Sequence, residues 1–266
     1  MNAAALEMNS KLVRGAAMPA GRVLRAYLKE ARYESVRMLR SPAFAIPFLG
    51  LPAALYLLFA VLLFGDALRG DPKGAMFVFS GFNVLGVMGP GMFGFGVVVA
   101  MEREQGLLKL KRALPMPPPA YLLAKMLMAM LFGVIVTATM IAAGLSLGHL
   151  PLTAGQCLSV AAINILGALP FCALGLFIGV RTSGKSAPAF VNLLYLAMIY
   201  LSGILFPLPK SMKAIAVVSP AWHLDQLAFR ALGAPSEGAP IVHVAVLVGV
   251  TLLLVVFAVR RLACVG

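Results

Sequence analysis

MEREQGLLKLKRALPMPPPAYLLAK, residues 101–125, lies between two apolar runs that are each long enough to cross a lipid bilayer. Only 12% of all residues are charged, yet several charged side chains fall close together here: Glu102, Arg103, Glu104, Lys109, Lys111 and Arg112. Three consecutive prolines, 117–119, then interrupt any helix. Because so many charges cannot lie in lipid, we expect residues 102–120 to form a water-exposed loop that a soluble partner can bind.

The composition of the chain predicts a membrane protein. Of its 266 residues 61% are hydrophobic, and the mean hydropathy is +0.96, whereas soluble domains are nearer half apolar. The apolar residues occur in runs of about 20, the length that crosses a bilayer as a helix. We therefore predict an all-α polytopic membrane protein with a single transmembrane domain over residues 1–266. The net charge of +13 is then loop charge that sets orientation, and we expect no nucleic-acid partner.

Six apolar segments are the predicted transmembrane helices: 44–64, 75–101, 121–147, 157–180, 188–206 and 241–259. Pro47 and Pro52 should kink the first of them, since proline cannot donate the helical hydrogen bond. The second is rich in glycine, which lets helices approach closely in lipid. Residues 208–232 are apolar but broken by prolines, and neither half is long enough to span. We predict that they form a re-entrant helical hairpin at the outer face.

Residues 22–40 precede the first span and have the pattern of an amphipathic helix. Apolar side chains share one face: Leu24, Tyr27, Leu28, Ala31, Met38 and Leu39. Cations share the opposite face: Arg22, Arg25, Lys29, Arg32, Arg37 and Arg40. We expect this helix to lie in the headgroup plane of the lipid bilayer, with its cations against anionic lipid. The alternative is an ordinary solvated helix.

The distribution of lysine and arginine predicts the orientation. If the N-terminus is inside, 17 of the 22 basic residues fall in the inner segments 1–40, 102–125, 181–185 and 260–261. Cytoplasmic loops carry an excess of these residues. We therefore expect a multi-pass protein of the cell (inner) membrane, with both termini and the charged loop in the cytoplasm.

The predicted spans contain few residues that could take part in catalysis or ion transport. When Lys125 is counted with the charged loop, they contain no Asp, Glu, Lys or Arg. Ion-coupled carriers need such groups at membrane depth, so any transport must draw its energy from outside the bilayer. The three cysteines and three histidines have no metal-ligand spacing, and we predict no catalytic residue, metal ligand or cofactor in this chain.

Two weaker patterns remain. Residues 179–186, GVRTSGKS, match the phosphate-binding pattern GxxxxGK[ST]. That loop works only between a β-strand and a helix, whereas this segment follows an apolar helix, so we interpret it as a short turn. Four mildly polar residues are candidates for lining a substrate pathway: Asn83, Asn192, Tyr195 and Ser202. The alternative role of such residues is a hydrogen bond between helices.

The order of these features resembles the permease subunits of ABC-2 type transporters, which are exporters driven by a separate ATPase. Residues 104–108, EQGLL, match the family's E-x-G-x-L coupling segment, with Leu107 where the family often has Thr. Residues 202–207, SGILFP, resemble its SGxxFP stretch, and residues 219–230 resemble its outer re-entrant helices.

The resemblance implies a mechanism for the charged loop. The permease would form a homodimer, and each copy would bind one ABC ATPase subunit, which holds ATP and magnesium. The residues implied as the ATPase contact are Glu102, Arg103, Glu104, Gly106, Leu107, Leu108, Leu110 and Arg112. Gly106 would allow a tight turn. Glu102 and Glu104 would begin a short helix, where carboxylates suit the positive end of the dipole.

We therefore expect the chain to be the permease of an ATP-driven exporter. A pathway without charge suggests a lipophilic or amphipathic substrate, such as a drug-like compound or a lipid. The alternative is a non-transporting membrane scaffold that recruits a soluble partner through the same loop. A path across the membrane that responds to nucleotide separates the two.

Overall fold

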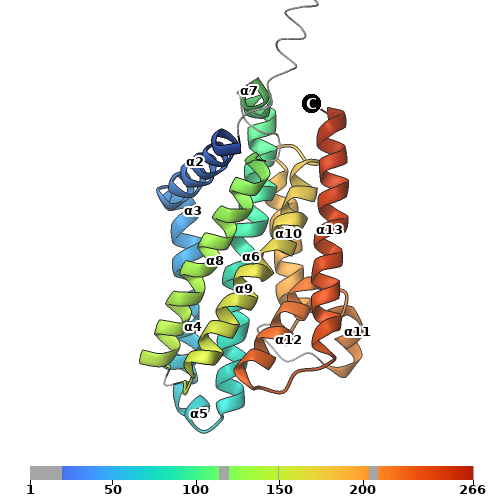
Figure 1. Cartoon of the computed structure of the whole chain (residues 1–266). Coiled ribbons are helices and arrows are strands. Elements are labelled where there is room, and N and C mark those ends of the chain that lie inside the picture. Colours follow the sequence, from blue (N-terminus) through green and yellow to red (C-terminus); the bar gives the residue numbers. More distant parts are fainter. Residues whose placement is uncertain (1–19, 114–119, 149, 204–208, 266) are drawn as a thin grey trace, which may run out of the picture.

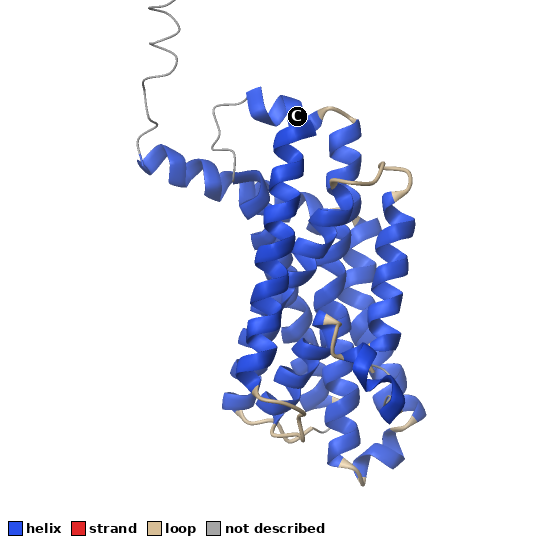
Figure 2. Cartoon of the chain, turned by 90° about the vertical axis from the view of Figure 1, so that its right-hand side faces the viewer, coloured by secondary structure: helices blue, strands red, loops and turns tan. Residues whose placement is uncertain are grey.

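The computed structural model describes residues 20–113, 120–148, 150–203 and 209–265, and the elements in these ranges are all helices (Figures 1 and 2). The prediction of an all-α protein is confirmed. Five of the described helical runs are long and apolar enough to cross a membrane: Pro42–Leu63, α6 (Pro72–Glu104), α8 (Ala120–Ser146), α9 (Ala154–Gly179) and Pro240–Arg261 within α13 (Pro240–Val265). The chain is therefore a polytopic membrane protein.

The first of these runs is an irregular helix. Its elements are α3 (Pro42–Ala45), a π-helical turn (Ile46–Gly50), α4 (Leu51–Leu57) and a second π-helical turn (Leu58–Leu63). Pro47 lies in the first widened turn and Pro52 follows it. Because neither proline has an amide hydrogen to donate, the regular ladder is interrupted there and the wider turn accommodates the loss.

The long helix α6 forms the centre of the bundle, and most of its apolar length is buried. α9 packs closely along it because glycines face the contact. A Cβ on Gly175 would come within 2.6 Å of the Met92 carbonyl oxygen, and one on Gly179 within 2.6 Å of the Gly96 oxygen. Only glycine permits this approach, and the resulting van der Waals contact is what favours helix association in lipid.

The last third of the chain contains shorter helices. α10 (Ala187–Leu201) is apolar but has 15 residues, and part of its predicted continuation, residues 204–206, lies outside the described residues. The segment predicted as a hairpin contains α11 (Lys213–Ala216) and α12 (Pro220–Leu232). α12 packs against α6, α9 and α13, and it ends at Gly233, whose φ is +78°.

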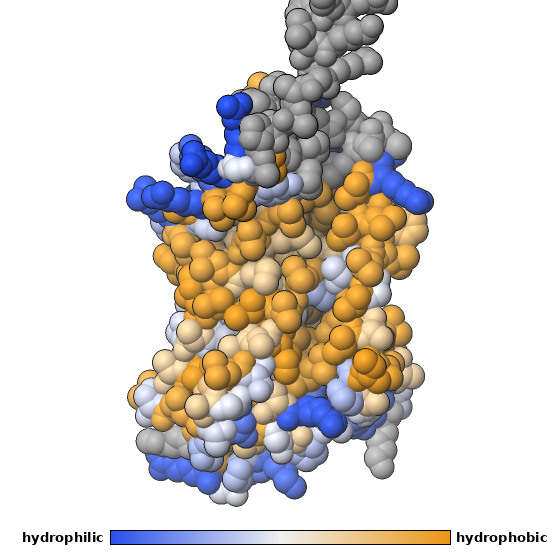
Figure 3. Space-filling model, in the orientation of Figure 1, coloured by the Kyte–Doolittle hydropathy of each residue, from blue (hydrophilic) through white to orange (hydrophobic). Residues whose placement is uncertain are grey.

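The two ends of the bundle differ. Figure 1 shows α2 (Ala20–Leu39) and α7 (Leu107–Ala113) at one end, which we call the α2 end, and α5 (Gly65–Arg69), α11 and α12 at the other, the α12 end. Figure 2 shows that α2 lies nearly perpendicular to the long helices and extends beyond the side of the bundle. A broad hydrophobic band separates the ends on the face in Figure 3, as expected for a surface that lipid covers.

Candidate functional site

The charged segment after the second span begins inside a helix. α6 continues beyond Met101 to Glu104, and the chain then turns at Gly106, whose φ is +73°. α7 follows at once, with the Leu110 amide donating to the Gly106 carbonyl oxygen at 3.2 Å. A Cβ at Gly106 would meet nothing within 4 Å. Glycine is therefore needed for the left-handed backbone and not for space.

The expectation that Glu102 and Glu104 begin the short helix is wrong. Both lie in the last turn of α6, and α7 begins at Leu107. The C-terminal end of a helix carries partial negative charge, which is unfavourable for a carboxylate. Glu102 is nevertheless buried there, with 3% of its surface exposed, because cations from two other helices neutralise it.

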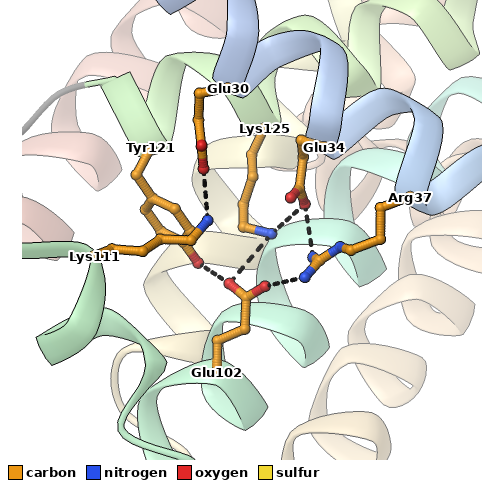
Figure 4. A network of polar contacts seen from close by, with 7 residues as sticks. All are labelled: Glu30, Glu34, Arg37, Glu102, Lys111, Tyr121 and Lys125. Carbon is orange, nitrogen blue, oxygen red and sulfur yellow. Dashed lines mark hydrogen bonds and ion pairs between the residues drawn. The ribbon is translucent and has the colours of Figure 1, made fainter. Parts of the chain in front are cut away.

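Glu102 belongs to an ionic cluster that we define as Glu34, Arg37, Glu102 and Lys125 (Figure 4). Glu102 Oε1 lies 2.7 Å from Arg37 Nη1 on α2, and Oε2 lies 3.5 Å from Lys125 Nζ on α8. The Tyr121 hydroxyl donates to the same Oε2. Glu34 accepts from both cations, at 2.5 Å from Lys125 and 2.9 Å from Arg37. Two carboxylates and two cations thus balance one another.

Lys125 corrects the expectation that the spans carry no charge. It lies in α8, inside a run that is long and apolar enough to cross a membrane, and its exposed fraction is 0%. A lysine near a helix end can extend its ammonium group to water, but here α2 covers it and supplies Glu34. The buried charge is tolerated because it is paired.

A second ion pair ties α7 to α2. Lys111 Nζ lies 2.6 Å from Glu30 Oε1, with exposed fractions of 24% and 20%. The same ammonium group lies 4.5 Å from the centre of the Tyr121 ring, a cation–π contact. Through Glu30, Glu34 and Arg37, the single helix α2 is therefore bonded to α7, α8 and α6.

Arg37 keeps its charge in this environment. Burial by itself would lower the pKa of the guanidinium, but the carboxylates of Glu34 and Glu102 raise the pKa above its usual value. This cation is the most exposed member of the cluster, with 46% of its side chain accessible. Because it remains ionised, it continues to offset the two carboxylates across the physiological pH range.

Arg103 holds the last turn of α6 to the connection between α9 and α10. Its guanidinium donates to the carbonyl oxygens of Val180 and Thr182, the latter at 2.6 Å. A cation is favourable at this C-terminal end of α9 because of the helix dipole. Residues 179–186 follow α9 directly, so the phosphate-binding pattern has a helix and not a strand before it.

The leucines of α7 divide between two surfaces. Leu108 packs against an apolar cluster that includes Phe95 and Val99, and Leu107 is half-buried. Leu110 points away from this cluster, with 64% of its surface exposed. The side chain of Arg112 lies outside the described residues. α7 therefore has one side anchored to the membrane bundle and one free side.

Two of the candidate pathway residues form hydrogen bonds between helices. Asn83 of α6 is fully buried and accepts a hydrogen bond from the Thr137 hydroxyl of α8 at 3.1 Å. The Tyr195 hydroxyl of α10 donates to the Leu85 carbonyl oxygen of α6 at 3.1 Å. These contacts fit the alternative role of such residues, which is to join helices in lipid.

The other two pathway candidates, Ser202 and Asn192, have different surroundings. The Ser202 hydroxyl donates to Ser219 Oγ at 2.5 Å, which links the end of α10 to the start of α12. Asn192 is exposed on α10. The four candidates thus share no hydrogen-bond partner, and the structure does not gather them into one site.

Sequence reasoning missed most of the ionic cluster and its neighbours: Glu30, Glu34, Arg37, Tyr121 and Lys125. A signal for two of them was present. Glu30 and Glu34 are acidic residues one helical turn apart in an otherwise basic helix, which places them on one face. Nothing in the sequence indicates that the partner of that face is α8, because Lys125 lies more than 90 positions away from Glu34 along the chain.

Comparison with known families identifies the class of this protein. A family model described as ABC-2 type transporter matches residues 30–226, and the chain belongs to this family. It is the permease component of such a transporter, a non-catalytic transmembrane subunit, and permeases of this family partner with ABC ATPase subunits.

A curated relative from Bacillus subtilis (strain 168) is named "Putative transport permease YvfS". It is 27% identical over 198 residues, which cover 73% of this chain and 80% of the relative. This similarity agrees with the family assignment, since the name of the relative also describes a transport permease.

Proposed function

We propose that this permease moves a lipophilic or amphipathic substrate out of the cytoplasm, driven by ATP hydrolysis in a separate ABC ATPase subunit that binds α7. The supporting observation is the set of ion pairs behind α7, through which α2 is bonded to α7, α6 and α8. ATP and magnesium would be held by the ATPase. Two ATPase copies would act on a permease homodimer.

The ion pairs give a physical route for force. Removing one partner of a buried ion pair costs about 3–5 kcal/mol, because the other charge stays buried without compensation. α2 would therefore carry α6 and α8 with it through Arg37 and Glu34. A displacement of α7 would reach α2 through the partly exposed, weaker pair of Lys111 and Glu30. The four helices would move together instead of sliding past one another.

The free side of α7 is the proposed ATPase contact. Leu110 is exposed, as is its chain neighbour Lys109, and Glu104 is exposed at the end of α6. An apolar side chain with a polar rim is typical of protein interfaces. Gly106 would form the turn that joins α7 to α6. Arg103 would transmit the motion of α7 to the connection before α10.

The proposed topology has six spans. α10 and the residues that follow it would form the fifth span, and α11 with α12 would form the outer re-entrant hairpin. The basic α2 end would face the cytoplasm, as the excess of lysine and arginine favours. α2 itself would lie at the lipid surface, where Leu24 and Leu28, each about 60% exposed, can enter the headgroup region.

The surface of α10 supports a lipophilic substrate. Its exposed large side chains are Phe190, Leu193, Leu196 and Tyr200, and Asn192 lies among them. We propose that this surface and Asn192 line the pathway. Asn83, Tyr195 and Ser202 would hold the neighbouring helices and become accessible only when those helices separate.

A test of the ATPase contact compares Leu110→Asp with Val218→Asp. Both residues are exposed and apolar, at 64% and 78%, but Val218 lies at the α12 end. The permease should co-purify with its ATPase, and Leu110→Asp should reduce the recovered ATPase at least tenfold while Val218→Asp leaves it unchanged. Equal recovery with the two variants would contradict the proposed contact.

A second experiment separates the transporter from a scaffold. In a chain whose three native cysteines are replaced by serine, single cysteines are placed at Asn83 and Asn192. If the membrane domain opens during transport, the labelling rate of the buried position 83 should rise when ATP is added to the complex, and that of position 192 should change too. If the labelling rates at both positions are the same with and without ATP, the scaffold is favoured.

A further inference from the structure

Two buried histidines meet at the α12 end of the molecule. His223 of α12 and His243 of α13 are 1% and 3% exposed, and their Nδ1 atoms are 2.8 Å apart. His223 Nε2 lies 2.8 Å from the carbonyl oxygen of Val217, and His243 Nε2 lies 2.7 Å from that of Glu237. The two rings and two carbonyl groups therefore form a chain of three short polar contacts.

These contacts fix the number of protons that the pair must hold. A carbonyl oxygen only accepts hydrogen bonds, so each Nε2 must carry a hydrogen, and the contact between the Nδ1 atoms needs one more. Two neutral imidazoles have two ring hydrogens between them, which leaves one of the three contacts with facing lone pairs. Two charged imidazolium rings have four, which places two hydrogens between the Nδ1 atoms. Only a pair with one extra proton satisfies all three contacts.

Among the described residues, the groups around the pair do not supply another partner for this proton. The carboxyl of Asp225, two residues along α12, accepts a hydrogen bond from Ser80 of α6. The carboxylate of Glu237 is paired with Lys213. The apolar parts of α6 and α9 contribute no Asp, Glu, Lys, Arg or His, and α10 contributes tyrosines as its titratable groups.

Two further observations favour a single positive charge here. The Trp222 ring lies 5.0 Å from the His223 ring and 5.3 Å from the His243 ring, within the distance at which the π-face of an indole stabilises a cation. Burial lowers the pKa of His223, the hydrogen bond to the Val217 carbonyl raises it, and the charge of His243 lowers it, so the two rings do not charge together.

We propose that His223 and His243 form a binding site for one shared proton, and that this proton joins α12 to the start of α13. With no extra proton or with two extra protons, one of the three contacts is repulsive, and α12 is released from α13. The site is independent of the ATPase contact, since it lies at the opposite end of the bundle (Figure 1).

This site has a distinctive pH profile. When α12 is released, the two rings no longer share a proton, and together they hold two extra protons in acidic solution and none in alkaline solution. The joined state always holds one. By linkage, joining is therefore most favourable at an intermediate pH and weakens on both sides, by up to about tenfold per pH unit as one proton is gained or lost on release.

The experiment measures hydrogen exchange of residues 220–232 in the full chain in lipid nanodiscs, between pH 5 and 8.5, corrected for intrinsic exchange rates. An Asp225→Asn background removes the other titrating group of α12. We expect maximal protection of α12 at an intermediate pH, with at least a fivefold loss at each extreme, while α9 stays unchanged. As a second readout, the emission of Trp222, the single tryptophan, should change over the same two pH ranges.

Matched variants decide whether the histidines cause the effect. His243→Gln and His223→Gln should abolish the maximum, because each keeps a donor for the carbonyl but cannot titrate, whereas His149→Gln, at the third histidine of the sequence, should preserve it. A maximum that persists in the first two variants would overturn the proposal. If those variants do not fold, the background protein alone decides, and protection without a maximum between pH 5 and 8.5 overturns it.

Discussion

The α2 end and the α12 end bury polar groups in different ways. At the α2 end two carboxylates and two cations from three helices neutralise one another, and the bonds join α2, α6 and α8. At the α12 end the buried titratable groups include two histidines and Asp225, whose carboxylate accepts a hydrogen bond from a serine and pairs with no cation among the described residues. The first end depends on fixed charges, whereas the second depends on protonation, and the two ends should therefore respond differently to mutation and to pH.

The largest effect should come from removing Lys125. Lys125→Met leaves Glu34 and Glu102 buried with Arg37 alone to balance them, so the free energy of unfolding should fall by about 3–5 kcal/mol. Denaturation in mixed micelles measures this change. Adding Glu34→Gln should recover a large part of it, because the cluster is then neutral again.

The control for this prediction is Arg69→Met, which removes a cation from an exposed ion pair with Asp66 near the α12 end. Water already screens that pair, so no loss of stability is expected. If Arg69→Met and Lys125→Met destabilise the protein equally, burial of the ionic cluster is not what makes it important.

The second effect is a pH dependence at the α12 end. Burial raises the pKa of Asp225 from 3.8 to about 7, so the folded protein holds this proton more tightly than the unfolded chain does. The contribution is favourable below pH ~4, is lost as the pH rises through about 7, and stays lost above it. Asp225→Asn should therefore gain stability relative to wild type across this range, by roughly 4 kcal/mol at ~1.4 kcal/mol for each pKa unit between 3.8 and about 7.

Thermal unfolding at pH 5 and pH 8 measures the difference, and the gap between Asp225→Asn and wild type should widen at pH 8. Parallel stability curves for the two proteins would show that the carboxyl titrates normally. Glu102→Gln is the matched comparison at the α2 end, where the carboxylate has two cations. It should lower stability and not raise it at pH 8.

A smaller effect compares two glycines in the left-handed region. Gly106 and Gly233 have φ values of +73° and +78°, and an added Cβ would meet nothing closer than 3.6 Å at either position. Gly106→Ala and Gly233→Ala should each cost about 1 kcal/mol from backbone strain alone. Only Gly106→Ala should also alter the ATPase rate of the complex. Equal ATPase rates in the two variants would show that Gly106 has no role in coupling ATP hydrolysis to transport.

The smallest effect on stability should come from reversing the pair between α7 and α2. Glu30→Lys or Lys111→Glu alone places like charges together, at a cost of about 1 kcal/mol for a partly exposed pair. The double variant restores the attraction and should return both stability and the ATPase rate of the complex toward wild type. A double variant no better than the singles would show that this pair does not link α7 to α2.

Local features of the sequence predicted the local structure well. The apolar runs became helices because a backbone in lipid must satisfy its own hydrogen bonds. Gly106 takes the left-handed conformation that the turn requires. The prolines at 47 and 52 accompany an irregular ladder in the first apolar run. Each of these results depends on residues within a few positions of one another.

Contacts between distant residues were not predictable in the same way. Hydropathy placed Lys125 beside a loop, but its environment depends on α2, which folds over it and contributes Glu34. Likewise the polar residues of the spans were seen correctly as polar, yet their partners Thr137, Leu85 and Ser219 depend on how the helices are rotated.

The sequence by itself determined that this chain is a helical membrane protein and which of its segments are apolar, because hydrophobic length and charge act locally and need no knowledge of neighbours. Only the tertiary structure decided which buried groups are paired: the ionic cluster at the α2 end and the two histidines at the α12 end. The physical reason is that the free-energy cost of a buried polar group depends on atoms a few ångströms away in space, and the amino-acid sequence does not state those distances.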